Sequence, residues 1–102
     1  MNIIKQHNIN ERCRIGYFHN YEYEVYIYTD DILNDYPHVH IKGNGLKVSI
    51  AMTNNYNYCP HDVYNDFLSD EIYNEFIDFI NQHDDKYGNI SKRITDLFEL
   101  NN

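Results

Sequence analysis

The spacing of the apolar residues changes once along this chain, and the change indicates the class of fold. Between residues 15 and 52, the segments outside the turns and loops are rich in aromatic and β-branched residues and alternate as half-buried strands do. The alternation is clearest in four apolar residues: Leu46, Val48, Ile50 and Met52. From residue 70 on, apolar residues recur at helical spacing instead: Ile72, Phe76, Phe79 and Ile80. Strands first and helices last predict an α+β fold, in which a small antiparallel sheet of about three to five strands is followed by two C-terminal helices packed on one face.

Turn-forming residues divide the strand region. His19 and Asn20 separate two strands between Ile15 and Tyr28, and residues 42–45 predict a tight hairpin. In the second of the two strands we expect four residues on one face: Tyr21, Tyr23, Val25 and Ile27. The polar residues 29–36 that follow predict a loop.

Two helices are expected in the last third of the chain. The first covers about residues 70–82, and Ser69 is among the residues suited to start it. The second covers about residues 90–100, with Asn89 as its cap. Its apolar stripe consists of Ile90, Ile94, Leu97 and Phe98. We expect both stripes to be core.

The charge balance is strongly acidic, with sixteen Asp and Glu against eight Lys and Arg and a net charge of −8. A phosphate backbone is bound by clustered Lys and Arg, so we expect no direct contact with nucleic acid. An acidic surface suits a basic protein partner, and the eleven Tyr suit a protein interface. From the length we expect one domain, residues 1–102. Because no secretory leader and no apolar run of the ~18 residues that span a bilayer are found, we expect a cytoplasmic protein that does not bind membranes.

The segment P-H-V-H-I, residues 37–41, carries the strongest chemical signal. Residues i and i+2 of a strand point to the same side, so His38 and His40 would present both imidazoles on one face. A thiolate and a third imidazole follow at Cys59 and His61. Tetrahedral zinc accepts three nitrogens and one sulfur, and we therefore predict a zinc site formed by His38, His40, Cys59 and His61.

The number of ligands decides between two roles for such a site. Four protein ligands would close it and make the metal structural, which stabilises a small domain. Three ligands, His38, His40 and His61, would leave a position for water, with Asp62 or Asp35 as a nearby base. The sequence contains no motif of an established catalytic class, which favours a protein that is not an enzyme.

Four segments carry a resemblance to small uncharacterised proteins of low-GC Gram-positive bacteria and their phages. They are RIGYF (14–18), PHVH (37–40), FL (67–68) and EFIDFI (75–80). In the proteins that the chain resembles, a strand ending in P-H-x-H is followed by another strand, a loop with a histidine, and helices. The resemblance implies that His61 is this loop histidine. In size and acidity the chain also looks like the small phage anti-CRISPR proteins that inhibit the type II RNA-guided DNA nuclease.

The sequence therefore predicts a small acidic, zinc-stabilised protein of phage type that binds a basic bacterial nucleic-acid enzyme and inhibits it. The likeness to anti-CRISPR proteins implies that this enzyme is a type II RNA-guided nuclease. Two alternatives stay open. One is a small zinc-dependent hydrolase or nuclease, and the other is an accessory or antitoxin-like protein of a mobile element.

Overall fold

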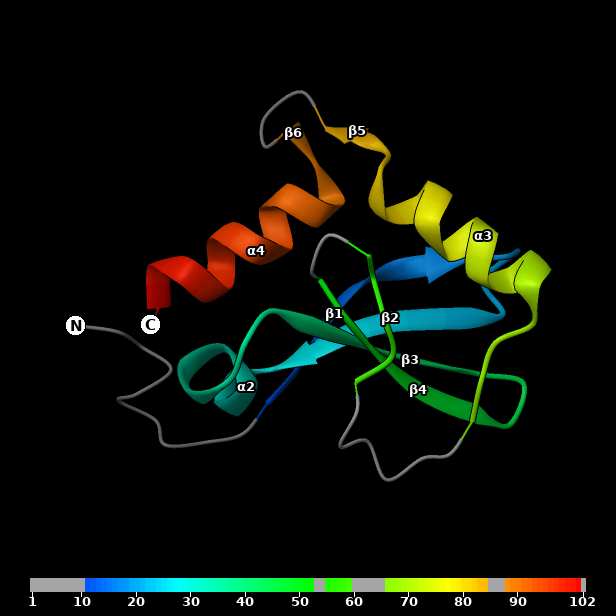
Figure 1. Ribbon diagram of the computed structural model, residues 1–102, viewed down its shortest axis with the longest axis horizontal. Coiled ribbons are helices and arrows are strands. Elements are labelled where there is room, and N and C mark those ends of the chain that lie inside the picture. The colour runs from blue at the N-terminus through cyan, green and yellow to red at the C-terminus, as the bar shows by residue number, and fades with distance from the viewer. Residues whose placement is uncertain (1–10, 53–54, 60–65, 85–87, 102) are drawn as a thin grey trace.

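The main element of the fold is a four-stranded antiparallel sheet, seen in a computed structural model that describes residues 11–52, 55–59, 66–84 and 88–101. Its strands are β1 (Arg12–Phe18), β2 (Tyr23–Tyr28), β3 (His38–Gly43) and β4 (Leu46–Ala51). The strands lie in the sheet in the same order as in the chain, so that each pairs with its neighbour in sequence (Figure 1). A separate short hairpin is formed by β5 (His83–Asp84) and β6 (Gly88–Asn89).

Two helices follow the sheet, α3 (Asp70–Ile80) and α4 (Ile90–Asn101), and both lie on the same side of it (Figure 1). The hydroxyl of Ser69 caps α3 by accepting from the N–H of Ile72 at 3.3 Å. The side chain of Asn89 caps α4 by accepting from the N–H of Lys92 at 2.8 Å. These caps satisfy N–H groups that have no partner within the first turn. The α+β fold predicted from the sequence is confirmed, and no helix in the described ranges is long and apolar enough to cross a membrane.

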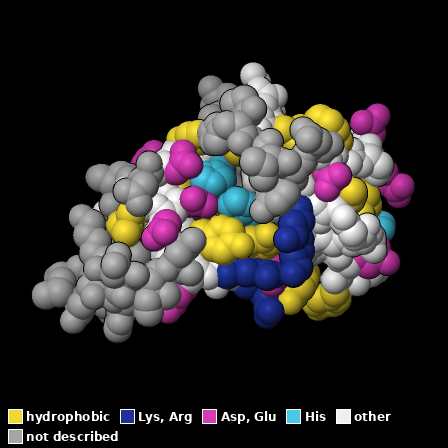
Figure 2. All heavy atoms as spheres, turned by 90° about the horizontal axis from the view of Figure 1, so that it is seen from below, with side chains coloured by type: hydrophobic (Ala, Val, Ile, Leu, Met, Phe, Trp, Pro, Cys, Tyr) yellow, Lys and Arg dark blue, Asp and Glu magenta, His cyan; other side chains and the backbone are white. Residues whose placement is uncertain are grey.

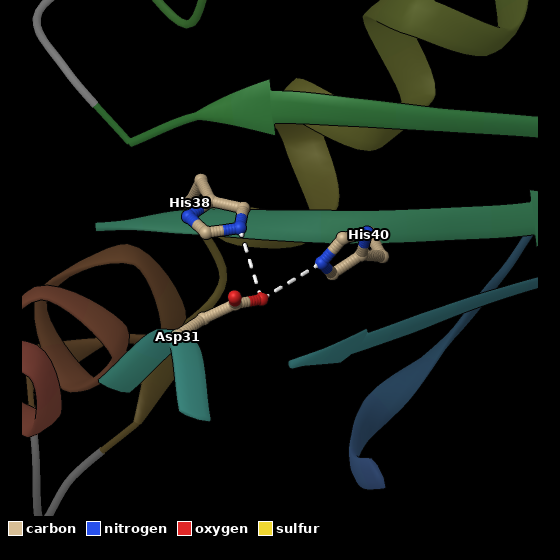
Figure 3. A group of neighbouring side chains, drawn as sticks. All are labelled: Asp31, His38 and His40. Carbon is tan, nitrogen blue, oxygen red and sulfur yellow. Dashed lines mark hydrogen bonds and ion pairs between the residues drawn. The ribbon is translucent and has the colours of Figure 1, made fainter. Parts of the chain in front are cut away.

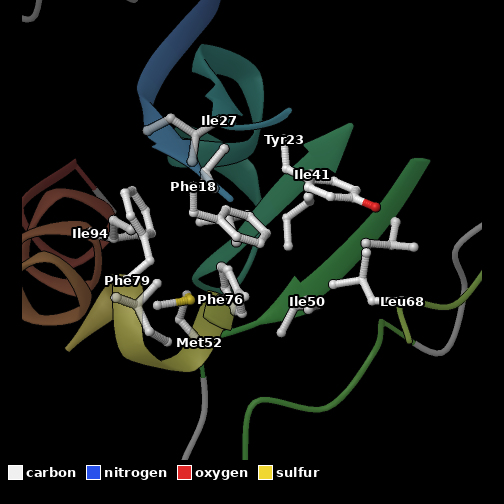
Figure 4. Close-up of a cluster of buried hydrophobic side chains, with 14 of the residues drawn as sticks. Phe18, Tyr23, Ile27, Ile41, Ile50, Met52, Leu68, Phe76, Phe79 and Ile94 are labelled. Atoms are coloured by element: carbon white, nitrogen blue, oxygen red, sulfur yellow. The ribbon is translucent and has the colours of Figure 1, made fainter. Parts of the chain in front are cut away.

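The core lies between the two helices and the apolar face of the sheet (Figure 4). The largest fully buried side chains come from both layers: Val25, Ile27, Val39, Ile41, Val48 and Ile50 from the strands, and Phe76, Ile80, Ile94 and Phe98 from the helices. The predicted stripe of α3 is buried throughout. At Gly16, beside a bulge in β1, a Cβ would lie 2.9 Å from Cζ of Phe79, so a larger residue there would force the ring of Phe79 to shift.

Two predicted connections differ from the structure. Tyr21 does not share a strand face with Tyr23, because His19, Asn20 and Tyr21 have φ angles of 57°, 56° and 64° and form a left-handed turn before β2 begins. The loop expected at residues 29–36 contains a short helix, α2 (Thr29–Asn34). Two acidic residues in its first turn suit the positive end of a helix, and Ile32 packs into the core with 1% of its surface exposed.

The face of the sheet opposite the core carries polar and aromatic side chains. The strand register places Arg14, Tyr26, His40 and Ser49 in one row across all four strands. Residues directly opposite each other on one face are close enough to interact. This row brings His40 next to an aromatic ring on one side and a hydroxyl on the other.

Candidate metal centre

Asp31 of α2 lies against both histidines of β3 (Figure 3). Its Oδ2 is 3.1 Å from Nε2 of His38 and 3.0 Å from Nε2 of His40. One ligand atom from each of the three residues lies within 4.8 Å of the other two. In a tetrahedral zinc site with bonds of about 2.0–2.1 Å, ligand atoms are separated by roughly 3.3 Å. The three side chains therefore need only small shifts to surround such an ion.

The start of α2 is anchored to Glu11, the residue before β1, and this anchor helps to place Asp31. The hydroxyl of Thr29 accepts from the N–H of Glu11 at 2.8 Å, and the N–H of Thr29 donates to the carbonyl of Glu11 at 3.0 Å. At the other end of α2, the N–H of Asp35 donates to the carbonyl of Asp31 at 2.9 Å. Because Ile32 is held in the core, the preceding carboxylate is held over β3.

His38 is oriented by a backbone carbonyl. Its Nδ1 is 2.9 Å from the carbonyl oxygen of Tyr36, and a carbonyl can only accept, so Nδ1 carries a proton. Nε2, which points at Asp31, then carries either a second proton or a free lone pair. A histidine whose Nδ1–H is held by a carbonyl while Nε2 faces an anionic ligand has the arrangement that metal-binding histidines adopt.

His40 is held on three sides. Its Nδ1 is 3.0 Å from the hydroxyl of Ser49, which can donate or accept. The ring of Tyr26 stacks on the imidazole with centroids 5.3 Å apart, and Tyr28 contacts it edge-on at 5.0 Å. These contacts fix the direction in which Nε2 points.

The electrostatics of the cluster favour charge on Asp31 and on His38. Burial raises the pKa of Asp31, but hydrogen bonds from His38 and His40 and their positive charge lower it further, so that its pKa lies well below the ordinary value. Burial lowers the pKa of His38, but the hydrogen bonds to Asp31 and Tyr36 and the charges of Asp31 and Asp35 raise it above its ordinary value. A divalent cation would replace the proton between Asp31 and His38.

The structure brings together two of the four ligands predicted from the sequence, His38 and His40. Cys59 is buried and does not belong to the cluster. Its N–H donates to the carbonyl of Ser49 on β4, so one whole strand separates it from the histidines of β3, and two strand spacings amount to about 10 Å. His61 lies outside the described residues, as does Asp62, and both stay predictions.

Asp31 was not predicted as a ligand, because the polar segment at residues 29–36 indicates a solvated loop. The signal that the sequence does offer is an acidic pair followed directly by Ile32 and Leu33, which is typical of the first turn of a short amphipathic helix. Placing that turn over β3 requires the tertiary contact of Thr29 with Glu11, which no local pattern shows.

Ser49, His40 and Asp31 are also linked by successive hydrogen bonds of 3.0 Å each. These are the residue types of a nucleophilic triad. A nucleophile must meet its substrate, however, and Ser49 is only 5% exposed. Asp31 is more open, with 26% of its side chain exposed. The hydroxyl thus orients the imidazole, and the cluster is reached from solvent at the carboxylate.

No protein-family model matches the chain, and no curated protein and no solved structure matches it. The interpretation of the cluster thus depends on its geometry alone. One carboxylate and two imidazoles in this arrangement could hold a metal ion.

Proposed function

We propose that the protein is a zinc protein in which Asp31, His38 and His40 are the ligands and a fourth position is left for water. The observation that carries this proposal is the 2.9 Å contact of Nδ1 of His38 with the carbonyl oxygen of Tyr36, from which a proton on Nδ1 follows. It leaves Nε2 facing the carboxylate that Nε2 of His40 also faces, so that three potential ligand atoms converge. Without a cation, the same geometry requires a buried imidazolium.

The ligand types favour a transition metal over magnesium and calcium, which prefer oxygen ligands throughout. Two imidazoles and one carboxylate suit both zinc and iron(II), and we propose zinc because three protein ligands plus one water complete its tetrahedral geometry. Protein sites that supply three ligands to zinc keep a position for water and lower the pKa of that water to about 7. The proposed activity is therefore metal-dependent hydrolysis, in which the partly exposed Asp31 marks the side from which a substrate would approach.

Metal analysis of tag-free protein tests the ligand set. After chelation and reloading with zinc, we expect one ion per chain in the unaltered protein and in Cys59→Ala. His38→Ala, His40→Ala and Asp31→Asn should each lower the zinc affinity by at least about a hundredfold. His83→Ala on β5 is the matched histidine control and should bind as the unaltered protein does. Full zinc binding by both His38→Ala and Asp31→Asn would overturn the proposal.

Hydrolysis is tested separately, because a bound ion can also be structural. A phosphodiester and an ester with a nitrophenol leaving group are suitable probes for zinc-loaded protein. We expect turnover that is abolished by chelation, restored by zinc and lost in Asp31→Asn. If the protein binds one zinc ion per chain but turns over neither probe, the proposed metal site stands. The proposed hydrolysis of phosphodiesters and esters is then wrong.

A second candidate function is the one expected from charge, inhibition of a basic bacterial nucleic-acid enzyme, with a type II RNA-guided nuclease as the specific target. It is supported by the outer side of α3, where Asp70, Glu71 and Asp78 are exposed while Phe76 and Ile80 are buried. A carboxylate-bearing helix face is electrostatically complementary to a basic groove. Binding to the nuclease should weaken with salt and with neutralisation of these three carboxylates, and absence of a complex at low salt would remove this candidate.

A further inference from the structure

A groove of about 560 Å³ crosses the open face of the sheet and gathers half of the basic residues of an acidic chain. Four of the eight Lys and Arg line it: Arg12, Arg14, Lys42 and Lys47. Among the residues that the structure describes, two carboxylates line it, Glu22 and Glu24. Figure 2 shows Lys and Arg side chains gathered beside apolar and histidine side chains on one face of the molecule. Locally the sign of the charge is thus opposite to the net charge of −8.

The two arginines are arranged by one buried carboxylate. Glu24 is 8% exposed, and its Oε1 pairs with Arg12 while its Oε2 accepts from Nε of Arg14 at 2.9 Å. Each guanidinium has five N–H donors, so most of them remain for another acceptor. The side chains of Arg12 and Arg14 are 37% and 61% exposed, which makes those donors accessible in the groove.

The two lysines lie directly opposite each other on β3 and β4. Like charges in such a position destabilise a sheet. Within the described part of the chain, Lys42 has no ion pair, because both oxygens of its other cross-strand neighbour, Glu24, are used by the arginines. An anion bound beside Lys42 would supply the counter-charge that Glu24 does not.

An exposed aromatic ring lies at the same groove. Tyr21 lines it, is 83% exposed and lies 5.6 Å from the ring of Tyr17, over which the guanidinium of Arg14 lies at 4.9 Å. Tyr21 is the last of the three left-handed residues in the turn. This conformation costs about 1–2 kcal/mol for each residue other than glycine, and three such residues in succession are rare. A strained backbone conformation persists only where the surrounding structure holds it in place, and such conformations are common at ligand-binding sites.

His19 ties the left-handed turn to α3. Its Nε2 lies 3.2 Å from a carboxylate oxygen of Glu22, and its Nδ1 lies 2.7 Å from one of Glu75 on α3. The carbonyl of His19 accepts from the N–H of Glu22 at 3.1 Å. The contacts of His19 therefore tie the turn to α3, and the turn holds Tyr21 at the groove.

We propose that this groove binds a nucleoside phosphate, with its phosphate between the lysines and arginines and its base on the ring of Tyr21. The volume lies in the range of small-molecule sites. Stacking on tyrosine is available to every nucleobase, and Arg and Lys are the usual partners of phosphate. A nucleic-acid strand is a poorer fit, because the described lining of the groove holds four cations and a longer polyanion would extend over a chain of net charge −8.

Calorimetric titration with AMP, in chelator and at low ionic strength, tests the proposal independently of any metal. We expect saturable binding, at least about tenfold tighter than binding of adenosine or inorganic phosphate. Lys42→Gln with Lys47→Gln should weaken AMP binding by about tenfold or more, because both changes remove a positive charge that faces the phosphate. Tyr21→Asn should weaken AMP but not phosphate, and asparagine tolerates the left-handed conformation. Lys92→Gln, an exposed lysine on α4, is the matched control and should leave AMP binding unchanged.

Three outcomes would overturn the proposal. The first is no saturable AMP binding in chelator, whatever the result of the zinc experiments. The second is AMP binding that is unaffected in both the lysine variant and Tyr21→Asn. The third is that single-stranded oligonucleotides bind more tightly than AMP, with an affinity that rises with their length. That result would indicate a surface that binds nucleic-acid strands.

Discussion

The ring of Tyr26 stacks on the imidazole of His40 with the two ring planes 16° apart. The guanidinium of Arg12 lies 4.2 Å from the centroid of the same tyrosine. Because β2 lies between β1 and β3, Tyr26 is contacted by Arg12 from one neighbouring strand and by His40 from the other. Tyr26 therefore separates the cationic groove from the Asp31, His38 and His40 cluster by a single buried ring.

Replacing this ring should affect stability and metal binding together. In Tyr26→Leu we expect a loss of about 1–3 kcal/mol in the free energy of unfolding, because a buried aromatic pair is removed. Zinc affinity should fall by about tenfold, since His40 loses a contact that orients it. Tyr58→Leu, which removes an aromatic contact with Phe67 instead, is the control. Urea unfolding and competition with a zinc chelator measure both quantities, and an unchanged affinity in Tyr26→Leu would show that the stack does not position His40.

The stability of the metal-free protein should depend on pH through Asp31 and His38. The pKa of Asp31 is lowered from 3.8, so its contribution is complete above that pH and is lost as pH falls through its folded pKa. The pKa of His38 is raised from 6.5, so its contribution is complete below that pH and is lost as pH rises through its folded pKa. The pair therefore stabilises the fold most between about pH 4 and 6.5.

Asp31→Asn isolates this effect. Relative to the unaltered protein in chelator, we expect it to lower the free energy of unfolding by about 1–3 kcal/mol near pH 5.5 and by less at pH 8 and at pH 3. Ser91→Ala, which removes a buried hydrogen bond and no charge, is the control and should cost the same at all three pH values. Chemical unfolding in a pH series measures it, and an equal loss at pH 5.5 and pH 8 would contradict a charged pair.

The buried face of α3 should dominate the stability of the helix layer. Phe76 is fully buried and contacts Phe18 with ring centroids 5.9 Å apart. Phe76→Ala should cost about 3–5 kcal/mol, because it removes a large apolar side chain and leaves a cavity. Phe67→Ala is the matched control, since Phe67 is 68% exposed and should cost less than about 1 kcal/mol. A small cost at Phe76, measured by urea unfolding, would mean that α3 is not packed as described.

The sequence predicts those parts of the fold that follow from local periodicity and capping. The stripe of α3 and the caps Ser69 and Asn89 are local patterns, and the structure confirms them. The sequence predicts the turn at His19 and Asn20 but not its extension through Tyr21, because the alternating pattern of the second strand extends back to Tyr21. In the structure the turn is also tied to α3 by the contact of His19 with Glu75, which is distant in sequence.

For the site, the sequence predicts the half that is encoded within one strand. His38 and His40 point to one face because they are two residues apart in β3. The third partner depends on how segments pack, and the residue type alone favours cysteine over aspartate. Cys59 is placed beyond β4 by the strand order, whereas Asp31 reaches the histidines because α2 folds back over β3.

The hydroxyl of Ser49 should matter for metal binding more than for folding. On binding zinc through Nε2, His40 must carry its proton on Nδ1, and Ser49 would then accept that proton at the observed 3.0 Å. Ser49→Ala removes the acceptor, so we expect zinc affinity to fall by about tenfold to a hundredfold. Ser91→Ala is the control, because its buried hydroxyl lies 3.0 Å from that of Tyr56, away from the cluster. Both variants should lose about 1 kcal/mol in unfolding free energy without metal, because each loses one buried hydrogen bond. Equal zinc affinities in the two variants would show that the Ser49 hydroxyl does not set the proton position on His40.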